Sequence, residues 1–443
     1  MKREEYTEEY LLSVPIKVVR AILRDDFNGT PGQLSKRELV DSILAAQSGK
    51  QISRRSKRGR RPLYSVNDGT IEETKCKGIV DTCPDGYAFL RCELYVGYKR
   101  DVFIPRVIIK QYGLRNGDLV KGDCVKIREK EQPALQKVVE INGFPVDDMY
   151  KRVKFDDLVP CYPNEKITLE RKERPDDYSI RCIDLLCPIG KGQRGLIVAP
   201  PKTGKTTLLE KIALSIEENY PDIKVMVLLI DERPEEVTEF KKCVQSEVIC
   251  STFDESPEHH IKVAELVSDR AKRLVESGFD VVILLDSITK LTRAYNTCTP
   301  PSGRTLSGGL DPMAVTAPKK FFGSARNIEN GGSLTVIATA LIETGSRMDE
   351  VIYEEFKGTG NMEIKLSGAL SEQRIFPAID LYKSGTRKEE LLLSKDEFAC
   401  ANKVRQLLRE NPRASESFLE MLAKTKTNGE FVVRFEEWLK IMK

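Results

Sequence analysis

The stretch R-G-L-I-V-A-P-P-K-T-G-K-T-T-L-L, residues Arg194 to Leu209, decides the fold of this chain. Its apolar run from Leu196 to Ala199 predicts a buried strand, two prolines end that strand, and the residues from Gly204 onward have helical composition. Strand, loop and helix in this order are typical of a phosphate-binding loop, whose backbone N–H groups surround phosphate oxygens. The sequence therefore predicts a site for a nucleoside triphosphate.

Two side chains of this loop have expected roles. Lys205 would reach the β- and γ-phosphates, and the Thr206 hydroxyl would bind Mg²⁺. The usual pattern begins with glycine, whereas Ala199 stands in that place, so the match is A-x-x-x-x-G-K-T. A chance match is the alternative, and the strand before the loop and the helix after it argue against chance.

Length and charge bound the organisation of the chain. At 443 residues the chain is long enough for two or three domains. Residues 50–61 contain seven basic residues and no acidic one. Their charge of +7 exceeds the formal net charge of the whole chain, +3, so the other residues together carry −4. A local basic arm of this kind favours contact with polyanions, and a solvated linker without a partner is the alternative.

Cysteine and histidine usage excludes several kinds of chemistry. The eleven cysteines are scattered without any C-x-x-C pair, so neither a disulfide framework nor a zinc site is indicated. The start of the chain leads into no apolar segment, and the longest apolar runs are far shorter than a membrane span. His259 and His260 are the only histidines, which leaves little material for Ser-His or Cys-His catalysis. We expect a soluble, cytoplasmic protein with reduced thiols.

Changes in charge, composition and hydrophobic periodicity divide the chain into five parts. We expect a helical N-terminal module at residues 1–49, a basic linker at 50–71, a small barrel at 72–147, a connector at 148–191 and an α/β ATPase domain at 192–443. Ser35 followed by Glu38 predicts a capping box at the start of a helix in the first part.

Five short alternating runs predict the barrel, with an oligonucleotide-binding (OB-like) fold as the leading candidate. The expected strands are 78–80, 87–94, 101–104, 122–127 and 136–141. Tyr87, Phe89 and Arg91 are two residues apart and so share one face, which Phe103 on the next strand would join. Aromatic rings beside a cation form a platform for stacked bases, worth about 1–3 kcal/mol per base. The alternative is that this face is the barrel core.

Alternating strands and helices predict a mainly parallel sheet in the last part. The expected strands are 195–199, 224–230, 281–285 and 333–340, with a helix at 261–276. Ligands of such sheets bind at the carboxyl ends of the strands. Asp286 ends one apolar run, where a carboxylate would support Mg²⁺. Asp231 and Glu232 end another, and we favour Glu232 as the residue that activates water, although which of the two faces the water stays open.

Long ordered motifs in this chain resemble the bacterial transcription termination factor Rho family. They are A-P-P-K-T-G-K-T-T-L-L, L-L-I-D-E-R-P-E-E-V-T-E, S-T-F-D-E-S, I-L-L-D-S-I-T-K-L-T-R-A-Y-N-T, M-D-E-V-I-Y-E-E-F-K-G-T-G-N-M-E, F-P-A-I-D and S-G-T-R-K-E-E-L-L. The resemblance covers nearly all of residues 192–443 and continues more weakly through D-G-Y-A-F-L-R and L-S-K-R-E-L-V. It implies a RecA-like ATPase domain and a homohexameric ring with ATP between subunits, which pulls single-stranded RNA through its pore and dislodges RNA polymerase.

The resemblance also implies roles for individual residues. Those expected to bind ATP and Mg²⁺ are Lys202, Thr203, Gly204, Lys205, Thr206, Thr207 and Asp286, with Phe376 stacked on adenine. The expected catalytic residues are Lys205, Glu232, Arg233 as a further cation, and Arg387 as an arginine finger that reaches a neighbouring subunit. Two loops, 300–309 and 344–347, would face the pore and present Arg304 and Arg347 to RNA phosphates. The alternatives are a surface salt bridge for Arg387 and passive surface loops.

Two other functions compete with an RNA-dependent ATPase and 5′→3′ translocase. A rotary-ATPase-type catalytic subunit shares the RecA-like core and a ring, but it gives no reason for aromatic residues beside a cation on the barrel. A non-enzymatic RNA-binding protein with a decayed ATPase is disfavoured by the intact Lys205, Glu232 and Asp286.

Overall fold

The computed structural model of the chain describes residues 6–14, 16–25, 36–47, 72–92, 95, 101–126, 132–410 and 414–441. The chain divides into two compact units, Met1–Val66 and Asn67–Lys443. The first unit contains the helices α1 (Glu8–Ser13), α2 (Ile16–Asp25) and α3 (Lys36–Gln47), which share a small apolar cluster. These helices agree with the predicted helical character. Ser35 of the predicted capping box and the basic arm lie outside the described residues.

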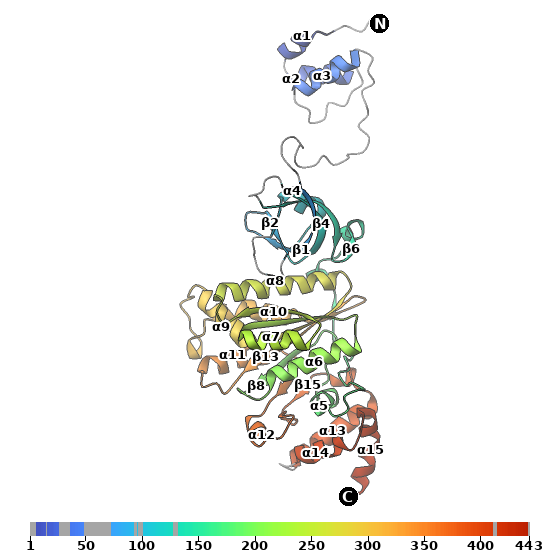
Figure 1. Ribbon diagram of the computed structural model, residues 1–443, viewed down its shortest axis with the longest axis vertical. Coiled ribbons are helices and arrows are strands. Elements are labelled where there is room, and N and C mark those ends of the chain that lie inside the picture. The colour runs from blue at the N-terminus through green and yellow to red at the C-terminus, as the bar shows by residue number, and fades with distance from the viewer. Residues whose placement is uncertain are drawn as a thin grey trace. The chain divides into compact units, whose positions relative to one another are not determined.

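The second unit begins with a closed barrel (Figure 1). Its elements are β1 (Glu72–Thr82), β2 (Ala88–Arg91), β3 (Val102–Ile104), α4 (Arg106–Tyr112), β4 (Leu119–Lys126), β5 (Ala134–Ile141) and β6 (Phe144–Pro145). The strands follow the order β3-β2-β1-β4-β5-β6, and pairing of β3 with β5 closes the barrel. The five predicted strands are confirmed with shifted ends, while helix α4 and the short β6 were not predicted.

A nine-stranded sheet forms the centre of the α/β domain that was expected to be an ATPase. Its elements are β7 (Pro160–Cys161), α5 (Tyr178–Leu186), β8 (Arg194–Ala199), α6 (Lys205–Asn219), β9 (Lys224–Glu232), α7 (Pro234–Cys243), β10 (Glu247–Thr252), α8 (Pro257–Glu276), β11 (Asp280–Asp286), α9 (Ile288–Cys298), α10 (Thr316–Gly323), β12 (Arg326–Ile328), β13 (Ser333–Leu341), α11 (Arg347–Lys357), β14 (Met362–Lys365), α12 (Gly368–Glu372) and β15 (Gly385–Thr386). The main order is β10-β9-β11-β13-β8-β14-β15. All neighbours in it are parallel except β14 and β15. The predicted, mainly parallel sheet is confirmed.

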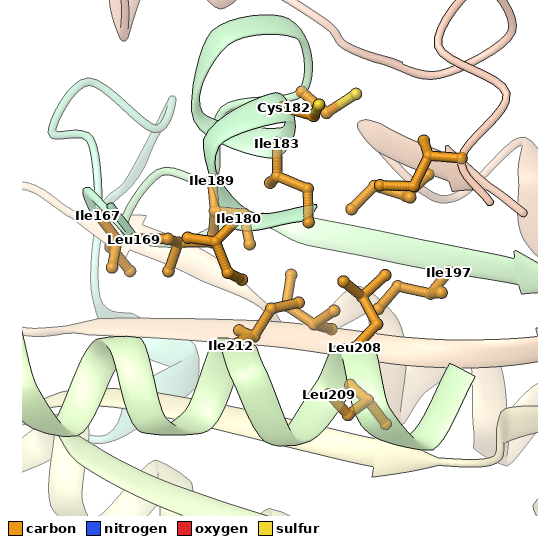
Figure 2. Packing of buried hydrophobic residues seen from close by; sticks show 14 of the residues in the cluster. Ile167, Leu169, Ile180, Cys182, Ile183, Ile189, Ile197, Leu208, Leu209 and Ile212 are labelled. Atoms are coloured by element: carbon orange, nitrogen blue, oxygen red, sulfur yellow. The ribbon is translucent and has the colours of Figure 1, made fainter. Parts of the chain in front are cut away.

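Strand alternation sends side chains into two cores, one on each face of this sheet. Along β8, Ile197 and Ala199 belong to one cluster, whereas Leu196 and Val198 belong to the other. The first cluster packs against α5 and α6 (Figure 2). The second packs against residues of α8, α9 and α11. Because both faces are covered, β8 is buried and apolar from Leu196 to Ala199, and the phosphate loop begins where this burial ends.

Part of the predicted connector is packed into the first core. Ile180 and Ile183 of α5 are buried there, together with residues of the C-terminal helices α13 (Lys395–Glu410), α14 (Ala414–Ala423) and α15 (Asn428–Ile441). Buried Arg181 joins these parts because its guanidinium donates to the Thr425 carbonyl oxygen at 2.7 Å. The domain boundaries given above stay predictions.

Helix α8 lies between the sheet and the barrel (Figure 1). The Arg115 guanidinium of the barrel pairs with Glu276 at 2.6 Å, and the Asn116 amide donates to Asp269 at 2.7 Å. Lys262, nearer the start of α8, pairs with Asp81 of β1 at 3.0 Å. The barrel is therefore tied to one helix of the ATPase domain along the length of that helix. Within the described residues, no helix is both long and apolar enough to cross a membrane.

Candidate functional site: a nucleotide site and an aromatic barrel face

The predicted phosphate loop connects β8 to α6. Ala199, which replaces the expected first glycine, is the last residue of β8 and is fully buried. The Thr203 hydroxyl donates to the Pro200 carbonyl oxygen at 2.7 Å and so closes the loop on itself. Gly204 precedes α6 with φ of 87°, a left-handed conformation that favours glycine. A Cβ atom there would meet nothing within 4 Å, so the backbone angle and not a lack of space explains this glycine.

The amino end of α6 is suited to anions. The first bond inside the helix runs from Leu208 N–H to Gly204 C=O at 3.0 Å, so the amides before it have no carbonyl partner within the helix. Those N–H groups and the helix dipole favour negative charge at this position. Lys202 and Thr207 are exposed on either side of the loop. The loop therefore presents both amides and a cation to a phosphate group.

Two acidic strand ends meet the loop lysine, as the sequence predicted. The Lys205 ammonium lies 2.7 and 2.6 Å from the two carboxylate oxygens of fully buried Asp286, and 3.3 Å from Glu232 Oε1. The Thr206 hydroxyl is 3.5 Å from Asp286. Strands β9 and β11 are parallel neighbours, so their carboxyl ends bring the two acids to one edge of the sheet.

Burial and charge oppose each other in this cluster. Burial raises the pKa of Glu232, and the nearby Asp286 carboxylate raises it further, while Lys205 and Lys290 act in the opposite direction. Burial by itself would lower the pKa of Lys205, but Asp286 and Glu232 outweigh it and raise that pKa. Glu232 is thus a carboxylate of increased basicity beside a lysine that stays protonated. This is the combination that proton abstraction beside a phosphate requires.

Sequence reasoning missed two polar residues of this cluster. The Lys290 ammonium of α9 lies 2.8 Å from Glu232 Oε1 and donates to the Asp231 carbonyl oxygen at 2.5 Å. The Thr339 hydroxyl of β13 donates to Asp286 at 2.7 Å. The sheet order explains both contacts, because β13 is a neighbour of β11 and α9 starts directly after β11. In the sequence, the only sign of these two residues was that they are polar and lie near the ends of predicted strands.

The segment around α12 lies beside the phosphate loop. The Ser371 hydroxyl donates to the Lys202 carbonyl oxygen at 3.3 Å. Phe376 follows this helix and has 55% of its surface exposed. Arg233, the residue after β9, is also exposed and forms the N-cap of α7.

Arg387 lies at the opposite edge of the sheet from this chain's own phosphate loop. It follows β15, whose Thr386 pairs with Met362 at the start of β14, and Met362 pairs with Gly195 near the start of β8. The loop follows the far end of β8, and the five steps from Arg194 to Ala199 at about 3.3 Å each span roughly 17 Å. Arg387 is exposed, and no ion pair of its guanidinium occurs within the described residues. Arg387 is therefore not part of the same chain's nucleotide site.

Three rings form an aromatic face on the outside of the barrel, defined here as Tyr87, Phe89 and Phe103. Their ring centres are 5.7 Å apart for Tyr87 and Phe89, 5.7 Å for Tyr87 and Phe103, and 6.1 Å for Phe89 and Phe103. All three are half-buried. The barrel core is made instead by the alternate residues, such as Ala88 and Leu90. The alternative that these rings are core residues is thereby excluded.

Arg91 shares the aromatic face, but its charge is already matched. Its guanidinium carbon lies 5.3 Å from the centre of the Phe89 ring. The same guanidinium donates to Asp81 at 2.7 Å and to Asp101 at 2.5 Å. The predicted cation is present, yet two carboxylates neutralise it, so its attraction for phosphate is weaker than the sequence suggested.

The two predicted pore loops contact each other. Gly308 has φ of 78°, and a Cβ atom on it would lie 2.6 Å from the Met348 backbone nitrogen, directly after Arg347. Only glycine allows this approach. Arg304 is exposed in the first loop and Arg347 is exposed at the start of α11. Gly308 therefore allows a close contact between two loops that each carry an arginine.

The two histidines meet at one hydroxyl group, which sequence reasoning did not anticipate. Ser251 Oγ lies 2.6 Å from His259 Nδ1 and 2.7 Å from His260 Nδ1. Burial lowers the pKa of His260. Ser251 is on β10, at the strand end beside β9. These contacts fix the start of α8 against the edge of the sheet.

Comparison with protein families divides the chain in the same way. The family described as "Rho termination factor, RNA-binding domain" matches residues 76–147. The family described as "ATP synthase alpha/beta family, nucleotide-binding domain" matches residues 179–386. The first match contains the aromatic face, and the second contains the phosphate loop and both strand-end acids.

Individual relatives match across almost the whole chain. Transcription termination factor Rho of Bacillus subtilis (strain 168) is 54% identical over 92% of this chain and 91% of its own length. The protein of the same name from Aquifex aeolicus (strain VF5) is 50% identical over 90% of this chain and 88% of its own length. That from Mycobacterium tuberculosis (strain ATCC 25618 / H37Rv) is 49% identical over 88% of this chain and 67% of its own.

A solved structure supports the fold alone. A prototypical ATPase from the type III secretion system of pathogenic bacteria has a TM-score of 0.50 and 24% identity, covering 65% of this chain and 79% of that one. At this identity the likeness shows a common arrangement of strands and helices and carries nothing about substrates.

Proposed function

This chain belongs to the Rho family of transcription termination factors, and from that premise we propose that it acts as a homohexameric ring that moves 5′→3′ along RNA. It is an RNA-dependent ATPase that terminates transcription, with an RNA-binding domain and an ATP-binding domain in one chain. The partner to be dislodged would be RNA polymerase with its nascent transcript. The cytoplasm, where transcription occurs in bacteria, would be its location.

The presence of an aromatic face on the outside of the barrel, in the same chain as the nucleotide site, carries this proposal. A rotary-ATPase-type subunit needs the second feature but not the first. The half-buried rings of Tyr87, Phe89 and Phe103 lie within the matched RNA-binding domain. Unpaired bases stack on such rings, whereas bases of a duplex are already stacked, so single-stranded RNA is the expected ligand.

ATP would bind with its phosphates at the start of α6. Lys202, Thr203, Gly204 and Thr207 would surround the phosphates, Lys205 would exchange its carboxylate partners for the β- and γ-phosphates, and Phe376 would stack on adenine. The contact of the α12 segment with the Lys202 carbonyl supports placing Phe376 at this site.

The residues near Lys205 fit Mg²⁺ that arrives with the nucleotide. Within the described residues, no group of three or more acidic, histidine or cysteine side chains would hold a metal alone. One carboxylate, Asp286, and one hydroxyl, Thr206, match an ion that keeps waters and phosphate oxygens as its other ligands. When bound, the ion would neutralise charge on the phosphates.

Glu232 would act as the general base for the attacking water. It is 6% exposed, and its raised pKa favours accepting a proton. The structure supports Glu232 over Asp231, because the Glu232 carboxylate contacts Lys205 whereas the backbone carbonyl of Asp231 binds Lys290.

Arg387 would complete the site of a neighbouring subunit as an arginine finger, with Arg233 as a further cation. Its exposure and its position at the opposite edge of the sheet support action on another chain's ATP. Arg304 and Arg347, on two loops in mutual contact, would bind RNA phosphates in the pore.

ATP hydrolysis measured with and without RNA tests the proposed function. We expect strong stimulation by single-stranded RNA, including a pyrimidine-rich polymer, and little by DNA of the same sequence or by duplex RNA. Directional displacement of a labelled strand from RNA with a single-stranded 5′ or 3′ extension then tests polarity. Equal ATPase rates in all reactions would contradict RNA dependence, and displacement from the 3′ extension alone would contradict the proposed direction.

A further inference from the structure

Lys290 has a contact that its place in the sequence does not reveal. Helix α9 starts directly after the buried strand end at Asp286, and the Ser287 hydroxyl caps it by accepting from Lys290 N–H at 3.2 Å. From this fixed backbone the Lys290 side chain turns back to the end of β9. Its ammonium binds both the Asp231 carbonyl oxygen at 2.5 Å and Glu232 Oε1 at 2.8 Å.

The two lysines of the cluster share one oxygen of Glu232. Lys205 Nζ and Lys290 Nζ lie 3.3 and 2.8 Å from the same atom, Oε1. For both lysines, the nearest oxygen of Glu232 is Oε1 and not Oε2. Lys290 therefore holds the carboxylate of Glu232 by the same oxygen as Lys205 does.

The two lysines differ in what ATP binding does to them. Lys205 is the phosphate-loop lysine, and a triphosphate would draw its ammonium away from Glu232. Lys290 is held as well by the backbone carbonyl of Asp231, which a triphosphate at the loop would not replace. With ATP bound, Lys290 would thus be the cation that still holds Glu232 Oε1.

We propose that Lys290 is a positioning residue for ATP hydrolysis, which holds Glu232 through Oε1 so that Oε2 faces the attacking water. This inference rests on the proposed role of Glu232. In the reaction the water oxygen bonds to the γ-phosphorus, the bond from that phosphorus to the bridging oxygen of ADP breaks, and the water proton passes to Oε2. Lys290 exchanges no proton. Its three N–H donors allow it to bind the carbonyl and the carboxylate together.

Lys290→Met tests the inference, because methionine has a similar length without the charge. We expect the single-turnover rate of hydrolysis with RNA to fall about 10- to 100-fold, as is typical when a catalytic group is misplaced. Affinity for a fluorescent ATP analogue should stay within about twofold, since Lys290 binds Glu232 and not the nucleotide. Lys290→Arg should recover most of the rate. Lys319→Met removes a lysine that is paired on the surface with Glu355 and should match the unaltered protein.

A second variant distinguishes a direct loss of rate from a loss of folded structure. Lys290→Gln can still donate to the Asp231 carbonyl oxygen but carries no charge. It should lose rate as Lys290→Met does, with an unchanged unfolding temperature. Normal hydrolysis by Lys290→Gln would show that the carbonyl contact alone matters, and would overturn the inference.

The Glu232→Gln background separates positioning from a structural role. If Lys290 acts through Glu232, then adding Lys290→Met to Glu232→Gln should cost less than about twofold, because coupled residues are not additive. An equal loss in both backgrounds, or a loss of ATP affinity with an unchanged rate, would overturn the inference. If Glu232→Gln alone hydrolyses ATP normally, the proposed function of Glu232 fails instead, which is a distinct result.

Discussion

The nucleotide site and the aromatic face of the barrel both pair cations with acids, but a ligand meets them differently. At the nucleotide site the ligand-binding cation itself is occupied, since Lys205 contacts Asp286 and Glu232 at 2.6 to 3.3 Å. In the proposed function, ATP would replace those partners. On the barrel, Phe89 and its neighbouring rings are half-buried and ready to stack, while the cation, Arg91, stays paired at one side.

The two regions also differ in completeness. The aromatic face is formed by residues of β2, β3 and the turn before them in one chain. The nucleotide site contains a base and a lysine, but the other expected cation, Arg387, lies at the far edge of the sheet. Under the proposed function, one chain would suffice for RNA recognition, whereas hydrolysis would need Arg387 of a neighbour.

The largest effect is expected from removing Arg387, the residue proposed to act on the ATP of a neighbouring chain. Arg387→Ala should lower RNA-stimulated turnover by about 10³- to 10⁵-fold, the usual contribution of an arginine finger, while ATP and RNA binding persist. Turnover and nucleotide affinity of the purified ring measure this. A surface salt bridge would instead give a small change in stability and near-normal turnover.

Mixing variants shows which chain supplies the arginine. Arg387→Ala and Lys205→Ala rings should each be inactive alone. In mixed rings, intact Lys205 of one variant meets intact Arg387 of the other, so part of the activity should return. Recovery supports action between chains, whereas none in rings shown to be mixed would place both residues in one site.

The next largest effect concerns the base. Glu232→Gln should bind ATP but hydrolyse it about 10²- to 10⁴-fold more slowly, because glutamine cannot accept the proton. In the unaltered protein, burial and Asp286 raise the pKa of Glu232. The hydrolysis rate should therefore be highest at pH values above that raised pKa, and it should fall as the pH falls through the pKa. A pH profile of single-turnover rates measures this. Asp231→Asn is the matched control, and a larger loss there would reverse the assignment of the two acids.

These residues show how far sequence reasoning reaches. Asp286 and Glu232 were predictable because apolar runs mark strands, and parallel strands present their ends at one edge. The ring spacing of Tyr87 and Phe89 was predictable from the period of two in a strand. Local pattern was sufficient wherever one element decided the outcome.

Partners from separate elements were not predictable. Lys290, Thr339 and the two aspartates around Arg91 contact the sites through the order of strands, which no local pattern contains. Helix α5 was hidden in a charged, proline-dotted stretch because its burial depends on the C-terminal helices. The sequence therefore indicated which groups are present but not which of them neutralise each other.

A smaller effect tests the open face of the barrel. Phe89→Ala should weaken RNA binding about 5- to 150-fold, equivalent to about 1–3 kcal/mol for the loss of one stacked base. Basal ATP binding should not change, since the ring has no contact with the nucleotide site. Phe144→Ala is the matched control, because the Phe144 ring is not part of the aromatic face. It packs instead against Phe279, with 5.9 Å between the two ring centres. Equilibrium binding of a short pyrimidine-rich RNA gives the affinities, and equal losses in both variants would indicate general damage to the barrel.

The smallest effect concerns where the attraction for phosphate resides. Because Asp81 and Asp101 neutralise Arg91, the aromatic face should contribute little to the salt dependence of RNA binding. The basic arm at residues 50–61 has seven cations and no acid, and it lies outside the described residues. Deleting the arm should flatten the slope of log affinity against log salt by about 0.7 for each RNA phosphate that the arm neutralises. Arg91→Gln should weaken binding with nearly the same slope as the unaltered protein. Titrations at several salt concentrations distinguish the two, and a slope unaffected by the deletion but flattened by Arg91→Gln would mean that the paired arginine, and not the arm, neutralises phosphate.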